Sequence, residues 1–370
     1  MTYDAIIIGL GAMGSAAAFH LANRGLRVIG IDRFRPPHTF GSSHGQTRII
    51  REAYFEGPAY VPLVQQAYVL WDELEQHTGT RLFLKTGGLM LGRPESIVVS
   101  GARKSAEMHQ LPHEILSVSD VQRRFPVLQP ASDMIAVWEP RAGILFPERC
   151  IAAHLQMAEQ RGATLRFDEQ VTRVELGEST VRVITNGEKL SASHVVLSCG
   201  SWLASLIPEL HLSLVIERQI QFWFATTHPD MFQPQRCPIH LWEHARGKFF
   251  YGFPDIGNGV KVAAHHEGAK VHPDRVDRDV AQDEIAAMKN TITPFLPFVD
   301  GRCVSSAVCM YTNTPDGHFL IDFHPHYRRA ILVSPCSGHG FKFSSAIGSV
   351  VADLVTTGKT EFDLTLFRYR

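Results

Sequence analysis

The chain has 370 residues, of which 45% are hydrophobic and 20% charged. This is ordinary globular composition for about two to three domains, and it excludes disordered and fibrous proteins. The 36 Lys and Arg against 37 Asp and Glu give a formal net charge of −1, so no overall positive field would gather nucleic acid or anionic lipid. The six cysteines contain no C-x-x-C pair, so we expect neither a disulfide scaffold nor a metal site. These features favour a small-molecule partner and a reducing, cytoplasmic location.

An apolar stretch over residues 5–22 could be mistaken for a membrane segment. Three glycines, Ser15 and His20 interrupt it, and the start Met-Thr-Tyr-Asp lacks the basic residues of a signal peptide. A strand, a tight turn and a buried helix is the better interpretation. We therefore expect no membrane association.

The N-terminal segment is predicted to form a strand, a turn, a helix and a second strand. The β-branched run 3–8 is typical of a strand buried on both faces. A helix is predicted over 12–24 and is closed by Gly25, and a second strand over 26–31 ends at Asp32. This order of elements is that of a dinucleotide-binding unit.

The first turn of this unit carries a G-x-G-x-x-G motif at Gly9, Gly11 and Gly14. Gly9 allows the tight turn, Gly11 lets the backbone approach a pyrophosphate, and Gly14 allows close packing of helix on strand. Asp32 is expected to accept a hydrogen bond from a ribose hydroxyl. The structural alternative is a Gly-rich turn in an ordinary α/β protein, and the motif does not distinguish FAD from NAD.

Similar elements recur at two later places in the chain. They are predicted as a helix over 148–161, strands over 164–167, 171–176 and 180–185, a buried strand running into a Gly turn over 194–202, a strand over 330–334, and a helix from about 341 to 354. The intervening stretches are richer in Pro, His and aromatic residues. We therefore predict a discontinuous cofactor-binding domain of residues 1–80, 145–210 and 300–370, with a substrate domain of residues 81–144 and 211–299.

A Gly/Ser turn after the dinucleotide unit would bring His44, Arg48 and Arg51 together. The two arginines would share a face if this segment were helical. A planar guanidinium in a pocket is suited to hold a carboxylate. The alternative is a surface ion pair of Arg51 with Glu52 or Glu56.

Three further residues stand out by type and position. Lys342 lies beside a Gly-rich helix start, where it could lend a second cation or remain solvated. Lys261 and His265 would face the same side of a predicted strand, which is unusual in an apolar strand. Cys309 lies in an apolar, strand-like run, where an inert buried cysteine is the usual interpretation.

Several segments match known sequences jointly and in collinear order. Besides the glycine motif they are residues 41–51, Tyr60-Val-Pro-Leu-Val64, Leu70-Trp-Asp-Glu-Leu74, Tyr251-Gly-Phe-Pro254, Ala307-Val-Cys-Met-Tyr311 and Ser337-Gly-His-Gly-Phe-Lys342-Phe. Together they resemble the monomeric sarcosine oxidase and N-methyltryptophan oxidase family of flavin-dependent amine oxidases. The resemblance implies an α/β fold, in which a mixed-sheet α+β substrate domain is inserted into a glutathione-reductase-like FAD-binding domain.

The resemblance also implies a chemistry. FAD would be joined through its 8α-methyl group to Cys309, and a secondary (N-methyl) amino acid would be oxidised at a C–N bond. Oxygen would become hydrogen peroxide, and the imine would hydrolyse to formaldehyde and a primary amino acid. We expect a monomer with no partner beyond the substrate and oxygen.

The likeness assigns roles to individual residues. Arg51 and Lys342 would bind the substrate carboxylate, with Tyr311 also at the substrate, and Lys261 would activate oxygen. Other catalytic positions around the flavin ring would be His44, Arg48, Tyr251 and His265. Cofactor contacts would be Gly9, Gly11, Gly14, Asp32, Ser42, Thr47, Cys309, Gly338, Gly340 and Lys342.

The chain also departs from the family pattern. Ser43-His44 and Gln46 stand where the family commonly has His-His and Asp, and Cys336 stands where small or aromatic residues are usual. The segment 241–247 lacks the familiar pattern. The substrate side chain is therefore the least determined part of the resemblance, and a cyclic or otherwise N-substituted amino acid is an alternative substrate.

Other classes of protein share part of these features. An NAD-dependent dehydrogenase would share the glycine motif, but it would not be expected to have three separated nucleotide-domain pieces or the Cys309 segment. A flavoprotein dehydrogenase that passes electrons to a partner protein differs only in its reactivity with oxygen. A non-catalytic flavin-binding module is the remaining alternative.

Overall fold

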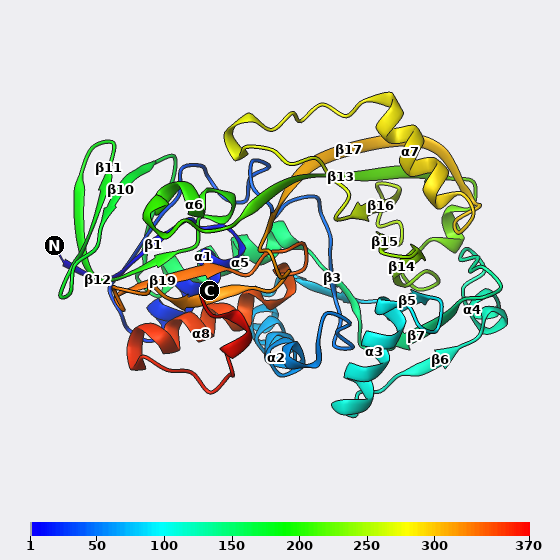
Figure 1. Cartoon of the computed structure of the whole chain (residues 1–370), viewed down its shortest axis with the longest axis horizontal. Coiled ribbons are helices and arrows are strands. Elements are labelled where there is room, and N and C mark those ends of the chain that lie inside the picture. The colour runs from blue at the N-terminus through cyan, green and yellow to red at the C-terminus, as the bar shows by residue number, and fades with distance from the viewer. Residues whose placement is uncertain (1) are drawn as a thin grey trace.

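The computed structural model describes residues 2–370, which form two parts, each built on a large sheet (Figure 1). In the first sheet the strand order is β10 (Val171–Glu175), β11 (Val181–Thr185), β12 (Lys189–Leu197), β1 (Thr2–Ile8), β2 (Val28–Ile31) and β9 (Thr164–Arg166). β12 also pairs with β19 (Ala330–Ser334), which pairs with β18 (Leu320–Phe323). The central pairs β12–β1, β1–β2, β2–β9 and β12–β19 are parallel.

The β-branched run of β1 is explained by burial on both faces. Ile7 packs into the cluster formed with four helices, which are α1 (Ala12–Asn23), α2 (Val61–Thr78), α5 (Pro147–Gln160) and α8 (Ser344–Thr357). Ile6 and Ile8 belong to a different cluster, with the β10–β11 hairpin and residues around the short helix α6 (Leu203–Leu206). Alternate side chains of a strand point to opposite faces, so each face of the sheet has its own core.

The second sheet is mostly antiparallel. Its strand order is β17 (Val299–Asn313), β13 (Val215–Thr226), β16 (Val260–His265), β15 (Lys248–Gly252), β14 (Ile239–Ala245), β5 (Gly88–Gly92), β7 (Ile135–Glu139) and β6 (Glu114–Leu116). Three helices accompany this part, namely α3 (Ile97–Met108), α4 (Val118–Arg124) and α7 (Gln282–Ile292). A small third sheet joins β3 (Arg48–Ile50), β8 (Gly143–Leu145) and β4 (Phe83–Lys85).

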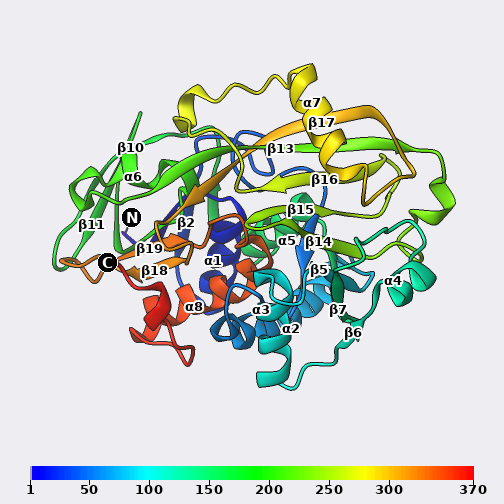
Figure 2. The same ribbon diagram turned by 45° about the vertical axis from the view of Figure 1, so that its right-hand side comes forward.

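The paired strands β13 and β17 form a long ribbon between the two parts, as both views show (Figures 1 and 2). Their pairing runs from Val215 opposite Asn313 to Thr226 opposite Val299. The predicted domain boundary at residue 300 therefore falls at the start of a strand of the second sheet, and β17 does not belong to the first sheet. The apolar run 307–312 indicates a strand, but its composition does not say which sheet the strand joins.

The predicted α/β fold with a mixed-sheet second part is confirmed. The segment with Arg48 is a strand and not a helix, because it pairs with β8, so the helical face considered for Arg48 and Arg51 does not exist. Among residues 2–370, no helix has both the length and the apolar character needed to cross a membrane.

Candidate active site

Two adjoining cavities lie where the two parts of the molecule meet. The larger has a volume of about 380 Å³ and lies at the ends of β1 and β2, and the smaller has a volume of about 120 Å³. Both are lined by Ala12, Met13, Ser42, Ser43, Pro335 and Cys336. The shared lining makes them neighbouring sections of one site.

Gly9 and Gly11 of the glycine motif line the larger cavity. Gly9 has a φ of +88°, and a Cβ there would lie 2.6 Å from the Ser198 carbonyl oxygen. A Cβ on Gly14 would overlap the Gly9 carbonyl oxygen, whereas a Cβ on Gly11 would meet nothing within 4 Å. The protein itself therefore requires Gly9 and Gly14, while Gly11 faces open space. Gly11 is also the N-cap of α1. Because it has no side chain that could cap the helix, the helix N-terminus fits the pyrophosphate of a dinucleotide.

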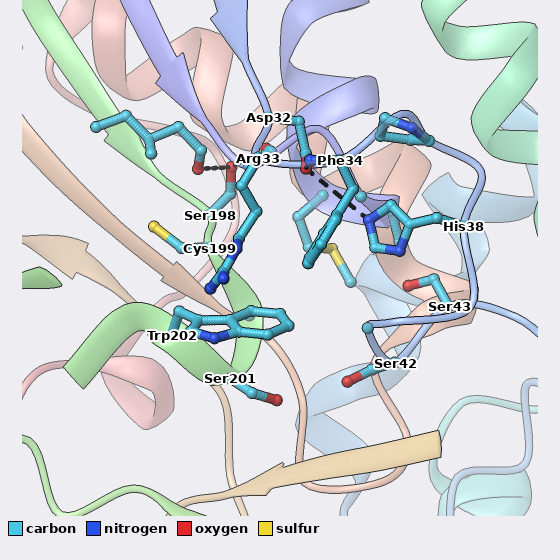
Figure 3. Close-up of a pocket in the computed structure, with 18 of the residues that line it drawn as sticks. Asp32, Arg33, Phe34, His38, Ser42, Ser43, Ser198, Cys199, Ser201 and Trp202 are labelled. Carbon is cyan, nitrogen blue, oxygen red and sulfur yellow. Dashed lines mark hydrogen bonds and ion pairs between the residues drawn. The ribbon is translucent and has the colours of Figure 1, made fainter. Parts of the chain in front are cut away.

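Asp32 follows β2 and is fixed in the larger cavity (Figure 3). Its Oδ2 accepts a hydrogen bond from the Leu10 N–H (2.7 Å) and its Oδ1 accepts one from the Phe34 N–H (2.9 Å). Burial raises the pKa of this carboxyl. Each carboxylate oxygen has a further lone pair, so Asp32 can also accept from a ribose hydroxyl, as the motif predicts.

Four side chains beside Asp32 form a bridge, namely Arg33, Phe34, Trp202 and Asp274. The guanidinium carbon of Arg33 lies 4.9 Å from the ring centroids of both Phe34 and Trp202. Asp274 Oδ1 lies 3.0 Å from Arg33 Nη1 and accepts a hydrogen bond from Trp202 Nε1 (2.7 Å). All four residues line the larger cavity, and Figure 3 shows Arg33 extending toward Trp202. Sequence reasoning missed this bridge. The position of Trp202, directly after the Gly turn that follows a predicted parallel strand, was a signal that could have placed it at the cavity.

The smaller cavity collects most of the predicted flavin and substrate residues from five separate segments of the chain. They are Ser42, Arg48, Arg51, Tyr251, His265, Cys309, Tyr311, Gly338, Gly340 and Lys342. The lining also contains residues that had no predicted role, namely Met13, Ile49, Glu56, Leu241, Phe253, Met310, His339 and Phe341. Leu241 begins the segment that departs from the family pattern, so this departure reaches the cavity wall.

Four predicted residues do not line either cavity: Gly14, His44, Thr47 and Lys261. Lys261 is buried, and its Nζ donates to the Gly45 carbonyl oxygen (2.6 Å) and to the carbonyl and hydroxyl oxygens of Thr47 (3.0 and 3.1 Å). Burial lowers its pKa well below the usual range. His44 is buried, and its Nε2 has no hydrogen-bond partner in the described chain. Burial and then Arg48 lower its pKa to about 3, so the ring is neutral near pH 7.

Two cations of the smaller cavity are held by the chain itself. Arg51 forms an ion pair with Glu56 (2.6 Å) and donates to the Ala53 carbonyl oxygen (3.0 Å). The alternative partner Glu56 is thus the observed one, but the pair is buried and not on the surface. Burial and then Arg51 lower the pKa of Lys342 to about 7. With Arg48 also present, positive charge exceeds negative charge in this cavity, which suits an anionic ligand.

The rest of the wall is mostly aromatic and neutral. Tyr311 Oη lies 3.2 Å from His265 Nδ1, and burial lowers the pKa of His265 well below its usual range. Burial likewise raises the pKa of the Tyr251 and Tyr311 hydroxyls. The free thiol of Cys309 is 2% exposed and sits opposite Gln219 in the β13–β17 ribbon. The cavity thus offers cations, neutral hydrogen-bonding groups and a thiol.

Known proteins resemble the chain over its whole length. The family described as FAD dependent oxidoreductase matches residues 4–354. A monomeric sarcosine oxidase of Streptomyces avermitilis is 45% identical, with 99% of this chain and 97% of that protein covered. N-methyl-L-tryptophan oxidase of Escherichia coli K12 is 35% identical, with 100% and 99% covered. The structure of NikD, described as an unusual amino acid oxidase essential for nikkomycin biosynthesis, has a TM-score of 0.87 at 23% identity, with 100% and 98% covered.

Proposed function

This chain belongs to the FAD dependent oxidoreductase family, within its group of sarcosine and N-methyltryptophan oxidases, and we propose that it oxidises N-methyl amino acids with oxygen. The proposal rests on one observation. Arg51 and Lys342 line the same small cavity as the Cys309 thiol, and this cavity adjoins the glycine-lined one. A carboxylate held by the two cations would lie within the same cavity as the attachment point of the cofactor.

When bound, FAD would supply the redox chemistry: it would accept two electrons and one hydrogen from the carbon beside the substrate nitrogen, so that the C–N bond becomes an imine, and oxygen would take up the two electrons with two protons to become hydrogen peroxide. The chain would hold it at Asp32, at the helix N-terminus after Gly11 and through a thioether at Cys309. Hydrolysis of the substrate imine then yields formaldehyde and a primary amino acid when the substrate carries an N-methyl group.

The residues of this chain would bind and orient the substrate. Charge-assisted hydrogen bonds from Arg51 and Lys342 to the carboxylate fix the neighbouring C–N bond in one position, which lowers the entropic part of the barrier. Glu56 already occupies Arg51, so a substrate carboxylate must share or replace this partner.

The same cations would favour the reactive form of the substrate amine. A neutral amine must react, because an ammonium has no lone pair to support oxidation of its C–N bond. Positive charge on Arg48, Arg51 and Lys342 disfavours a further ammonium in the cavity, and the neutral groups Tyr251 and His265 do not counteract this. The cavity therefore lowers the pKa of a bound amine.

Peroxide release under air tests this function. Sarcosine, N-methyl-L-tryptophan and a cyclic secondary amino acid should be compared, each with its primary amine analogue as control. We expect peroxide and formaldehyde in equal amounts from at least one N-methyl substrate. Substrate-dependent bleaching of the flavin without oxygen, combined with no peroxide under air, would instead identify a dehydrogenase that needs an electron-accepting partner.

A further inference from the structure

A buried tyrosine lies behind both cations of the smaller cavity. Tyr54 is fully buried and does not line the cavity itself. The guanidinium carbon of Arg51 lies 4.3 Å from its ring centroid, and Lys342 Nζ lies 5.1 Å from the same centroid. The face of an aromatic ring attracts cations, so one ring contacts two like charges that would otherwise only repel each other. Ser105 in α3 donates to the Tyr54 carbonyl oxygen (2.6 Å) and anchors this residue to the second part of the molecule.

The hydroxyl of Tyr54 belongs to a hydrogen-bond chain whose direction is set at its far end. His339 Nε2 lies 3.0 Å from the Gly317 carbonyl oxygen, which can only accept, so Nε2 carries a hydrogen. Burial lowers the pKa of His339 to about 4, so near pH 7 the ring is neutral and its Nδ1 is an acceptor. Tyr54 Oη lies 2.6 Å from this Nδ1 and donates its hydrogen there.

This direction leaves the oxygen of Tyr54 free to accept from Lys342. Lys342 Nζ lies 3.4 Å from Tyr54 Oη and 2.7 Å from the His339 carbonyl oxygen. An ammonium has three N–H bonds. Tyr54 and His339 accept two of them, which leaves one for a ligand in the cavity that Lys342 lines.

We propose that Tyr54 and His339 are a positioning pair that holds the Lys342 ammonium for a substrate carboxylate. The inference rests on the proposed function, because it assumes that Lys342 binds this carboxylate. A purely structural role is the alternative, since the Tyr54 ring also packs against Tyr60 and Phe343. The two interpretations differ in what happens to carboxylate binding when only the hydroxyl is removed.

The pH dependence of binding provides a readout that packing would not change. Burial and then Arg51 lower the pKa of Lys342 to about 7, so carboxylate affinity should fall as the pH rises through this value. The charged and titratable groups that surround Lys342 are Arg48, Arg51, Tyr54, Glu56, His265 and His339. Loss of the Tyr54 oxygen removes an acceptor that favours the ammonium, so the fall in affinity should shift to lower pH.

The test is Tyr54→Phe in the holoenzyme, with propionate as a carboxylate that lacks the reacting amine. Its dissociation constant is measured from the change in flavin absorbance between about pH 6 and pH 9. We expect binding about tenfold weaker near pH 7 and a midpoint lowered by about half a pH unit or more. Because the phenyl ring is retained, the contact with Arg51 stays.

Tyr60→Phe is the matched control. Tyr60 Oη lies 2.9 Å from His318 Nδ1, so this variant also removes a hydroxyl bonded to a histidine in the same aromatic cluster, but Tyr60 makes no hydrogen bond to Lys342. We expect it to bind propionate as the unmodified enzyme does. An equal weakening in both variants would show that the effect comes from packing and would overturn the proposal.

Two further variants separate the possible failures. If Tyr54→Phe does not fold, His339→Ala removes the Nδ1 acceptor and leaves the Tyr54 hydroxyl the carbonyl oxygen of residue 339 (3.2 Å), where it competes with Lys342. This variant should weaken propionate binding in the same direction. Weak binding by Lys342→Met together with unchanged binding by the folded Tyr54 or His339 variant would overturn the positioning role alone. Unchanged binding by Lys342→Met would instead contradict the carboxylate role of Lys342 in the proposed function.

Discussion

At the scale of single residues, the site depends on charges that the chain holds in place before any ligand binds. Arg51 lies over Tyr54 and Phe55 and is paired with Glu56, while Lys342 has two acceptors from the chain. Their positions are thus fixed, and little side-chain entropy remains to be lost when a carboxylate binds.

Arg51→Gln should impair the reaction mainly for substrates that carry a carboxylate. Loss of one charge-assisted contact in a desolvated cavity costs about 2 to 4 kcal/mol, or roughly 30- to 1,000-fold in kcat/KM. The control is Glu56→Gln, which removes the internal competitor and should leave carboxylate binding equal or stronger. If a simple secondary amine without a carboxylate loses as much kcat/KM as an amino acid does, Arg51 supports the fold or the flavin instead.

Lys261 is predicted to act when oxygen reacts, because a fixed ammonium near the flavin would stabilise developing superoxide. Burial lowers the pKa of Lys261, whereas its three oxygen partners, two of them carbonyls that can only accept, favour the ammonium. Lys261→Met should be reduced by substrate within about tenfold of the normal rate, while stopped-flow reoxidation slows by about two orders of magnitude, or about 2.7 kcal/mol. Reoxidation at the normal rate would exclude this role.

The hydrogen bonds of Lys261 to Gly45 and Thr47 provide the competing explanation. Lys261→Gln retains N–H donors for these oxygens but carries no charge, so it serves as the matched variant. Slow reoxidation in both variants attributes the effect to charge. If reoxidation is slow in Lys261→Met and normal in Lys261→Gln, the effect comes from the hydrogen bonds that organise the loop at Gly45 and Thr47.

At the scale of elements, the short helix Pro273–Arg275 follows β16 in the chain and brings Asp274 to the larger cavity. Asp274 connects it to Arg33 after β2 and to Trp202 after β12. Arg278 adds hydrogen bonds to the Thr39, Phe40 and Val308 carbonyl oxygens. The segment from Asp274 to Arg278 therefore crosses beside the larger cavity, which contains the predicted ribose contact Asp32.

Asp274→Ala should accelerate loss of FAD from an enzyme that cannot attach it covalently. The ion pair is partly exposed and contributes about 0.2 to 1 kcal/mol, and loss of ordered Arg33 stacking adds a comparable amount, so we expect about two- to thirtyfold faster release. Flavin fluorescence in a Cys309→Ser background measures the rate. Asp133→Ala, which breaks the exposed Arg93–Asp133 pair outside both cavities, should have no effect. Equal rates in the two variants would contradict the bridge's role.

At the scale of the whole molecule, the cofactor is predicted to connect the two parts. The glycine motif directly follows β1 of the first sheet, and Cys309 belongs to a strand of the second. Acid precipitation should leave the yellow colour in the protein pellet, and Cys309→Ser should release it to the supernatant. Cys336→Ser is the control, because Cys336 lines the smaller cavity as Cys309 does, but its replacement should leave attachment intact. Colour in the supernatant from freshly purified unmodified enzyme would show that attachment does not occur.

The sequence predicted best those features that are encoded locally. The glycine motif, the strand before it and Asp32 lie within one continuous segment, whose strand, turn, helix and second strand form in the predicted order, and Gly9, Gly11 and Asp32 line the larger cavity. The bridge from Arg33 to Asp274 spans 241 positions and the contact of Tyr54 with His339 spans 285, so no local pattern indicates either. The partner of β17 was missed for the same reason, because strand pairing depends on the packing of the whole chain.

The surplus of cations in the smaller cavity has a consequence for the solution in which the protein works. Cations that hold a carboxylate do not distinguish the rest of the molecule that carries it, so we expect the cavity also to admit acetate, formate and other small organic anions. Such solutes would compete with the substrate, and they would do so more strongly below the pKa of Lys342, about 7, than above it. The apparent KM would then vary with buffer composition, so the organic acids of the surroundings would act as ordinary inhibitors of this chain.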